Sequence, residues 1–138
     1  GEVTASTWLI LVCEGYATGL TIRAAVGHEL PVFVALDAYN LQDVMPMLRA
    51  QFPAAALLIC ADDDWKSKDH EGPNPGRRRA MAVARKTERC GIVAPVFPRG
   101  QRLDGDTDFN DLQARCGLAT VQRQLGAAID AIRRSGRG

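Results

Sequence analysis

Four short, uninterrupted runs of apolar residues constrain the fold of this chain more than any other feature of its sequence. Each run ends near Gly, Pro or acidic residues, as strands do when both of their faces are buried in a parallel sheet. The segments between the runs repeat apolar residues at helical spacing, for example Leu41, Met45 and Leu48. We therefore predict buried strands over residues 8–13, 32–36, 55–61 and 92–97.

The alternation of these strands with helical segments predicts the fold class. Strand–helix–strand order implies right-handed crossovers, so we expect a compact, Rossmann-like α/β fold with about four parallel strands and helices on both faces. A chain of 138 residues fits one domain, with a core over residues 7–118 and a C-terminal helix. Because the first residue is Gly rather than Met, we expect a domain excised from a longer protein. The predicted helices are residues 17–26, 41–51, 75–90, 110–115 and 118–134.

Charge and cysteine content set broad limits on function. The formal net charge is only +1, so bulk charge gives no argument for nucleic-acid binding. No apolar stretch approaches the roughly 20 residues needed to cross a bilayer, and no membrane partner is expected. The cysteines lack C-x-x-C spacing, which favours reduced, structural thiols in a cytoplasmic protein. They are Cys13, Cys60, Cys90 and Cys116.

Acidic residues collect where the predicted strands end. Glu14 follows the first strand, and Asp62, Asp63 and Asp64 follow the third, so all four belong to the carboxyl edge of a parallel sheet. In extended chain Asp62 and Asp64 share one face, while Asp63 points away. Carboxylates that converge there either raise one another's pKa or hold a cation. Oxygen ligands favour Mg²⁺ or Mn²⁺, and no histidine stands at zinc-ligand spacing.

Other acids leave two interpretations open. Asp37 ends the second predicted strand and suits a turn or a helix start. Asp108 and Asp111 precede the short helix, where they could cap it or add metal ligands. The middle acid of the triplet, Asp63, is equally open between a structural and a functional role.

A cluster of basic residues opens the third predicted helix. Asn74 suits the N-cap and Pro75 the first helical position, and three arginines follow in the first turn. Cations at that end oppose the helix dipole, so the arrangement indicates either phosphate contacts or a solvated face that offsets the nearby acids. The charged loop over residues 65–73 could also touch substrate. The candidate phosphate contacts are Arg77, Arg78, Arg79, Lys66, Asn74 and Gly76.

These pieces, in this order, resemble the Toprim domain, and most closely its branch in plasmid- and phage-type DNA primases and primase–helicases. The resemblance covers roughly residues 7–118, and five motifs in order make it specific. The matching segments are residues 13–19 (CEGYATG), 35–41 (ALDAYNL), 60–64 (CADDD), 74–76 (NPG) and 108–112 (DFNDL).

The resemblance implies roles for individual residues. Glu14 matches the family's general acid or base, which in primases is the base for nucleotide addition. Asp62 and Asp64 match the metal-binding Asp-x-Asp pair, and Asp108 and Asp111 match a later acidic element counted with the metal ligands. The family topology places the first and third strands side by side. The implied cofactor is Mg²⁺ or Mn²⁺, and the implied partners are single-stranded DNA template and nucleoside triphosphates.

The implied activity is the nucleotidyl-transfer core of a DNA primase, with zinc-binding and helicase domains in the full-length protein. This chain contains neither module, so the isolated domain is expected to have little activity. Two alternatives are a Toprim-type metal-dependent nuclease and a non-catalytic nucleic-acid-binding module. A receiver domain fits poorly because the first strand offers only Glu14. A topoisomerase fits poorly because Tyr16 and Tyr39, the only tyrosines, fall within the local motifs.

Overall fold

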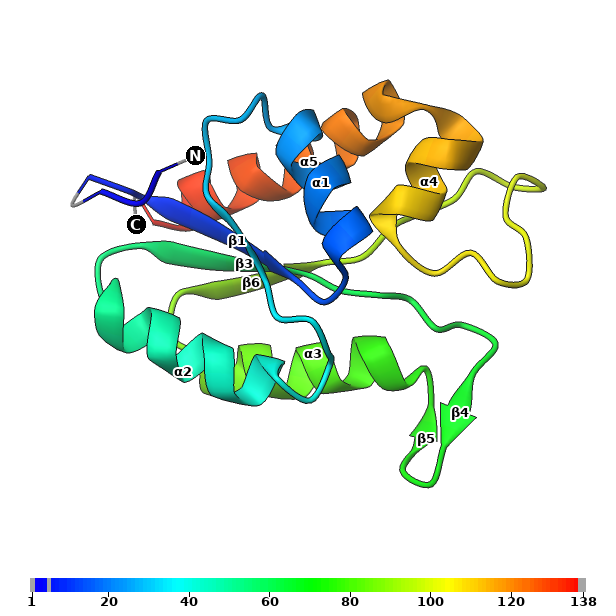
Figure 1. Ribbon diagram of the computed structural model, residues 1–138, viewed down its shortest axis with the longest axis horizontal. Coiled ribbons are helices and arrows are strands. Elements are labelled where there is room, and N and C mark those ends of the chain that lie inside the picture. The colour runs from blue at the N-terminus through cyan, green and yellow to red at the C-terminus, as the bar shows by residue number, and fades with distance from the viewer. Residues whose placement is uncertain (1, 5, 137–138) are drawn as a thin grey trace.

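The computed structural model describes residues 2–4 and 6–136 and contains a four-stranded sheet in the order β2-β1-β3-β6. All three neighbouring pairs of strands are parallel, so every carboxyl end points to the same edge (Figure 1). This confirms the predicted α/β class with four parallel strands. The strands are β1 (Leu9–Cys13), β2 (Val32–Val34), β3 (Ala56–Cys60) and β6 (Cys90–Val93).

The central pair, β1 and β3, fixes the position of the acids. Cys13 at the end of β1 pairs in register with Cys60 at the end of β3. Consequently Glu14 and the Asp62–Asp64 segment leave the sheet beside each other. The neighbouring first and third strands expected from the resemblance are therefore confirmed.

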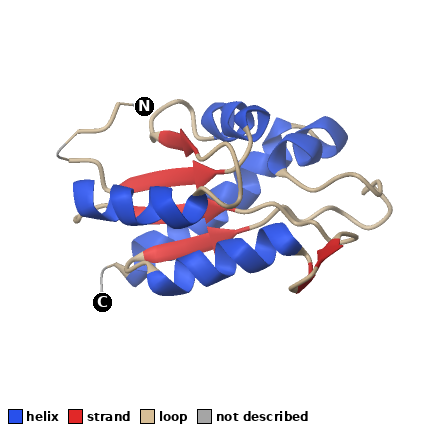
Figure 2. Ribbon diagram, turned by 60° about the horizontal axis from the view of Figure 1, so that its bottom comes forward, coloured by secondary structure: helices blue, strands red, loops and turns tan. Residues whose placement is uncertain are grey.

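Helices cover both faces of the sheet, in two layers that Figures 1 and 2 show from different sides. On one face α1, α4 and α5 pack over alternate residues of the central strands, such as Leu11 and Leu58. On the other face α2 and α3 pack over the intervening residues, such as Val12 and Ile59. The helices are α1 (Tyr16–Ala25), α2 (Leu41–Gln51), α3 (Pro75–Lys86), α4 (Phe109–Cys116) and α5 (Leu118–Ser135).

The burial pattern explains why the apolar runs form strands. All five residues of β1 and all five of β3 are buried, so each central strand needs apolar side chains on both of its faces. The edge strands β2 and β6 are only partly buried. The hydrophobic core therefore lies on both faces of the two strands that carry the acids, and it supports those acids rigidly.

Several predicted boundaries differ from the structure. The fourth strand is Cys90–Val93 rather than residues 92–97, and α3 ends at Lys86 rather than at residue 90. Arg89 has a positive φ of 50°, which marks the turn between them. The second strand ends at Val34, because Leu36 has a φ of 68° and such a backbone cannot continue a strand. Local apolar pattern could not reveal these turns.

The charged loop over residues 65–73 contains a hairpin that the sequence did not predict. Two antiparallel strands, β4 (Lys68–Asp69) and β5 (Gly72–Pro73), lie directly before α3. Each has only two residues, which is too short to show an apolar alternation. Figure 1 shows this hairpin projecting beyond the carboxyl edge of the sheet.

Within residues 2–4 and 6–136, no helix has the length and apolar character required to cross a bilayer. The four cysteines are free thiols, and Cys13 and Cys60 are buried. This agrees with the structural role predicted for them.

Candidate active site

Glu14 and Asp62 form the centre of the acidic cluster. Each follows a buried central strand, and the strand register places them side by side. Glu14 Oε1 and Asp62 Oδ1 are both buried without a hydrogen-bond partner. A buried carboxylate oxygen that lacks a partner is costly. This pair of oxygens is therefore the strongest local indication that the site receives a ligand.

The two carboxyl groups hold their protons unusually tightly. Burial, and after it the charges of Glu14, Asp108, Asp64 and Asp111, together raise the pKa of Asp62 to about 8. Burial likewise raises the pKa of Glu14 to about 7, assisted by Asp64 and Asp37 and opposed by Arg79. The ionised forms of these carboxyl groups repel one another, and a bound cation would remove that repulsion.

Asp63, the middle acid of the triplet, faces away from this centre, as the extended-chain argument predicted. Arg102 Nη1 donates to Asp63 Oδ2 at 2.7 Å, and Asn74 Nδ2 donates to Asp63 Oδ1 at 2.6 Å. Burial opposes ionisation of Asp63, but these hydrogen bonds and the charges of Arg102 and Arg77 lower its pKa below the ordinary value. Asp63 is therefore an ionised, structural carboxylate.

Asp64 contacts the start of α3. The backbone N–H of Gly76 donates to Asp64 Oδ2 at 2.8 Å. A Cβ at position 76 would lie 2.8 Å from that same oxygen and 3.2 Å from Cβ of Asp62, so glycine allows this approach without a shift of the aspartates. Asn74 caps α3 in a left-handed conformation with φ 52°. The Asn-Pro-Gly motif thus holds the aspartates, and the phosphate contacts suggested for Asn74 and Gly76 stay a prediction.

Asp108 and Asp111 form a capping box at the start of α4. Asp108 Oδ1 accepts from the Asp111 N–H at 2.8 Å, and its Oδ2 accepts from the Thr18 hydroxyl at 2.5 Å. Asp111 Oδ2 accepts from the Thr107 N–H at 2.8 Å. The capping interpretation thus has direct structural support, whereas metal binding by these two acids stays a prediction.

The basic residues differ in how far their charges are already paired within the protein. Arg78 and Arg79 both donate to Asp69 of the β4–β5 hairpin at 2.6 Å, and Arg79 also stacks on Tyr39. Their charges are therefore engaged within the protein. Arg77 is more available: its side chain is 54% exposed and lies 3.7 Å from Asp63. Lys66 lies on the surface, where it pairs with the exposed Asp104.

The donor set fits a hard divalent cation. In the described part of the chain, no group of three or more His, Cys, Asp or Glu side chains is already arranged to hold a metal ion. Mg²⁺ does not require such a cage, because it commonly binds one or two carboxylates and completes its shell with water and substrate phosphates. Asp62, Asp64 and Glu14 would supply the protein ligands. The two unpartnered oxygens of Glu14 and Asp62 are consistent with that role.

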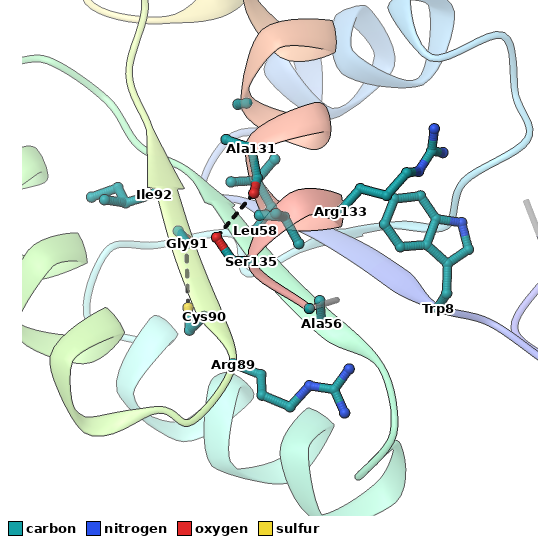
Figure 3. Close-up of a pocket in the computed structure, with 13 residues that line it drawn as sticks. Trp8, Ala56, Leu58, Arg89, Cys90, Gly91, Ile92, Ala131, Arg133 and Ser135 are labelled. Atoms are coloured by element: carbon teal, nitrogen blue, oxygen red, sulfur yellow. Dashed lines mark hydrogen bonds between the residues drawn. The ribbon is translucent and has the colours of Figure 1, made fainter. Parts of the chain in front are cut away.

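A cavity of about 540 Å³ lies elsewhere, at the amino-terminal ends of the strands. Figure 3 shows it between β6 and the end of α5, with Trp8, Ala56 and Cys90 on its walls. It contains none of the predicted site residues. We place the candidate site at the acidic edge instead, because the two buried carboxylate oxygens without hydrogen-bond partners lie there.

Three residues that contribute to the site were not predicted from the sequence. Arg102 lies in a polar loop, Thr18 lies in α1, and Asp69 lies in the unpredicted hairpin. Their partners are Asp63, Asp108 and the arginines of α3. The first two pairs join residues 39 and 90 positions apart, so no local spacing could have revealed them.

The fold and the site define a class: α/β domains that gather acidic side chains at the carboxyl edge of a parallel sheet. Within that class the chain belongs to the Toprim domain family, because the model of that family matches residues 9–119, most of the chain. This confirms the resemblance drawn from the sequence motifs.

Two relatives are both described as DNA primase TraC of Escherichia coli. One is 35% identical over 100 residues, covering 72% of this chain. The other is 29% identical over an alignment of 192 residues, covering 96% of this chain. The chain spans only 9% and 13% of the length of these relatives.

Two solved structures share the fold. The primase fragment of the bacteriophage T7 primase–helicase matches with a TM-score of 0.61 and 16% identity, over 88% of this chain and 45% of that one. A chain from a bacteriophage T7 lagging-strand DNA polymerase complex matches with a TM-score of 0.59 and 15% identity, over 90% and 61%. That complex contains primase domains bound to an RNA/DNA hybrid and dTTP. At these identities the likeness shows the fold alone.

Proposed function

We propose that this chain is the metal-dependent nucleotidyl-transfer core of a DNA primase that makes primers on single-stranded DNA. The observation that carries the proposal is the pair of unpartnered, buried oxygens of Glu14 and Asp62 at the carboxyl edge of the sheet. The relationship to DNA primase TraC favours primer synthesis over the other reactions that such a site could perform. Zinc-binding and helicase domains elsewhere in the full-length protein, and a cytoplasmic location in plasmid- or phage-type replication, belong to the same proposal.

Each acidic residue has a distinct part in the proposed reaction. Asp62 and Asp64 would hold Mg²⁺ or Mn²⁺, which when bound stabilises negative charge on the phosphate oxygens. Glu14 would accept the proton of the attacking 3′ hydroxyl. The hydroxyl oxygen would then bond to the α-phosphorus of the nucleoside triphosphate, while the bond from that phosphorus to pyrophosphate breaks. Burial raises the pKa of Glu14 to about 7 in the metal-free protein, and a carboxylate with a raised pKa is a better proton acceptor than an ordinary one.

Basic side chains near the acids would orient the nucleic acid or the triphosphate. Arg77 is the best candidate, because its exposed side chain lies at the start of α3 near Asp63. Lys66 is a second candidate on the adjacent loop. Contacts of this kind bind phosphates without reading base sequence.

A titration with Mn²⁺ followed by NMR tests the metal site. We expect paramagnetic broadening centred on Glu14, Asp62 and Asp64, and its loss in the Asp62→Asn/Asp64→Asn double variant. Scattered or absent broadening, even with nucleotide present, would contradict the catalytic proposal and favour a non-catalytic binding module.

Activity assays then identify the reaction. Template-dependent incorporation of nucleoside triphosphates, lost in Glu14→Gln, supports primer synthesis. Metal-dependent cleavage of DNA or RNA without incorporation would identify a nuclease instead. Because the isolated chain is expected to have little activity, the same variants belong in the full-length protein as well.

A further inference from the structure

Asp63 is held at every polar group that it possesses. Its N–H donates to the Thr107 carbonyl at 2.7 Å, and its carbonyl accepts from Arg102 Nη2 at 2.7 Å and from the Trp65 N–H at 2.7 Å. Its two carboxylate oxygens accept from Arg102 and Asn74. This residue stands between Asp62 and Asp64, so its orientation determines theirs.

Arg102 makes more of these contacts than any other side chain. Nη1 and Nη2 bond the carboxylate and the carbonyl of Asp63, and Nε donates to the Asp106 carbonyl at 3.0 Å. The guanidinium lies 4.7 Å from the ring centroids of both Trp65 and Phe97. The side chain is only 18% exposed. Arg102 thus joins the loop over residues 97–107 to the segment that carries the acids.

The contacts between Arg102 and Asp63 also affect the orientation of the neighbouring carboxylates, Asp62 and Asp64. Asp62 and Asp64 are joined to Asp63 directly through the backbone, so contacts that fix Asp63 also limit the orientations open to its two neighbours. Asp64 has a second support, the Gly76 N–H. Asp62 Oδ1 has no hydrogen-bond partner, so its position depends on the backbone at residue 63. Arg102 is the side chain that contacts that backbone, through the bond from Nη2 to the Asp63 carbonyl.

We infer that Arg102 is a positioning residue for the Asp62–Asp64 pair, acting through Asp63 without itself contacting metal, nucleotide or DNA. The inference rests on the proposed metal site. The guanidinium is committed to Asp63, Asp106 and two aromatic rings, which distinguishes it from the exposed Arg77. An arginine is required because no lysine can donate to three separate oxygens in this fixed, planar arrangement.

The decisive comparison is between Arg102→Met and Arg115→Met. Arg115 pairs with Asp106 in the same loop, at 2.9 and 3.1 Å, but none of its hydrogen bonds or ion pairs reaches Asp63. Both variants loosen the loop, whereas only the first releases the acid segment. Removing supporting partners of metal ligands typically weakens affinity by about 10–100-fold.

Mn²⁺ affinity is measured by calorimetry on the whole chain, well below the melting temperature of each variant. We expect Arg102→Met to weaken Mn²⁺ binding by about tenfold or more, Arg102→Lys by less, and Arg115→Met by less than about twofold. Equal losses in Arg102→Met and Arg115→Met, or no loss in either, would overturn the inference, because a merely structural arginine lowers the melting temperature without a specific effect on affinity.

NMR measurements on the metal-free protein separate this inference from the proposed function. In Arg102→Met the amide signals of residues 62–64 should broaden or shift and the Asp63 amide should exchange faster, while Arg115→Met leaves them as in wild type. If wild type binds no Mn²⁺ yet these amides respond, the positioning role stands and the metal proposal fails. If wild type binds Mn²⁺ and the amides do not respond, the positioning role fails.

A second pair of variants covers the case in which Arg102→Met does not fold. Asp63→Asn removes the charge that Arg102 holds but keeps the side-chain volume. Arg102→Lys keeps a positive charge. The losses of Mn²⁺ affinity in Asp63→Asn and Arg102→Lys should not add up in the double variant, because both substitutions weaken the same contact between Arg102 and Asp63. Additive losses would overturn the inference.

Discussion

Asp62 combines burial with nearby negative charge, and this makes the stability of the metal-free protein depend on pH. Its pKa rises from 3.8 to about 8 in the folded state. A carboxyl group whose folded pKa is raised stabilises the fold while protonated, and this contribution is lost as pH rises toward the folded pKa. Glu14 acts in the same direction with a pKa of about 7. The metal-free protein should therefore lose stability between about pH 4 and pH 8.

Asp62→Asn should flatten that dependence. A proton that binds only the folded state changes the free energy of unfolding by roughly 1.4 kcal/mol per pH unit, and solvent screening reduces this amount. We therefore expect the free energy of unfolding of wild type with EDTA to fall by about 2 kcal/mol between about pH 5 and pH 9. Urea unfolding measures this, and Asp62→Asn should lose clearly less. Asp130→Asn, on the exposed surface of α5, is the control and should follow wild type. A wild-type profile as flat as that of Asp62→Asn would contradict the prediction.

Gly76 matters because it lacks a side chain. In Gly76→Ala the new Cβ would meet Asp64 Oδ2 at 2.8 Å, so either the Asp64 carboxylate or the start of α3 must shift. We expect a loss of about 1–2 kcal/mol in the free energy of unfolding and weaker Mn²⁺ binding, measured by urea denaturation and calorimetry.

Gly126→Ala is the matched control. Nothing lies within 4 Å of a Cβ at that position in α5, so the alanine should stabilise the helix by about 0.5–1 kcal/mol and leave Mn²⁺ affinity unchanged. Equal behaviour of the two variants would show that the close approach at Gly76 has no importance.

At the scale of elements, α4 depends on its capping box. Asp108→Ala removes the N-cap acceptor and the bond from Thr18, so we expect a loss of about 1–2 kcal/mol by thermal or urea unfolding. Asp108→Asn retains a good cap and should lose much less. If Asp108→Asn folds like wild type but binds Mn²⁺ many-fold more weakly, Asp108 is a metal ligand as well as a cap.

The arginines of α3 should differ in their effect on nucleic-acid binding. Asp69 engages Arg78 and Arg79, whereas Arg77 remains largely exposed. Arg77→Ala should therefore weaken binding to single-stranded DNA more than Arg78→Ala does. It should also reduce the slope of log affinity against log salt concentration by about 1, the amount expected for the loss of one phosphate contact. Fluorescence anisotropy at several salt concentrations measures both effects. Equal losses of DNA affinity in Arg77→Ala and Arg78→Ala would show that the ion pairs with Asp69 break when DNA binds.

For the whole molecule, ligand binding and folding are linked. An ion that binds only the folded chain adds about 2.7 kcal/mol of stability at one hundred times its dissociation constant. Mn²⁺ should therefore raise the melting temperature of wild type, more strongly near pH 8 than near pH 5, because protons compete for Asp62 and Glu14. EDTA should reverse the effect. An equal rise in the Asp62→Asn/Asp64→Asn variant would place the binding elsewhere.

The sequence alone determined the parts of this protein that depend on local pattern. Uninterrupted apolar runs mark the central strands β1 and β3 because residues buried on both faces must all be apolar. The helix over residues 41–51 was predicted with the boundaries that α2 has. The placement of Glu14 and the aspartates directly after strands indicated one acidic edge, because parallel strands share their carboxyl ends.

Only the tertiary structure decided which of those residues work together. The pairing of β1 with β3 brings Glu14 beside Asp62, and it depends on contacts between segments more than forty residues apart. The hold of Arg102 on Asp63 and of Thr18 on Asp108 likewise joins distant parts of the chain. From the sequence, Arg102 is indistinguishable from any solvated charge in a polar loop. Its role appears only in the fold, because its partner Asp63 lies 39 residues away along the chain.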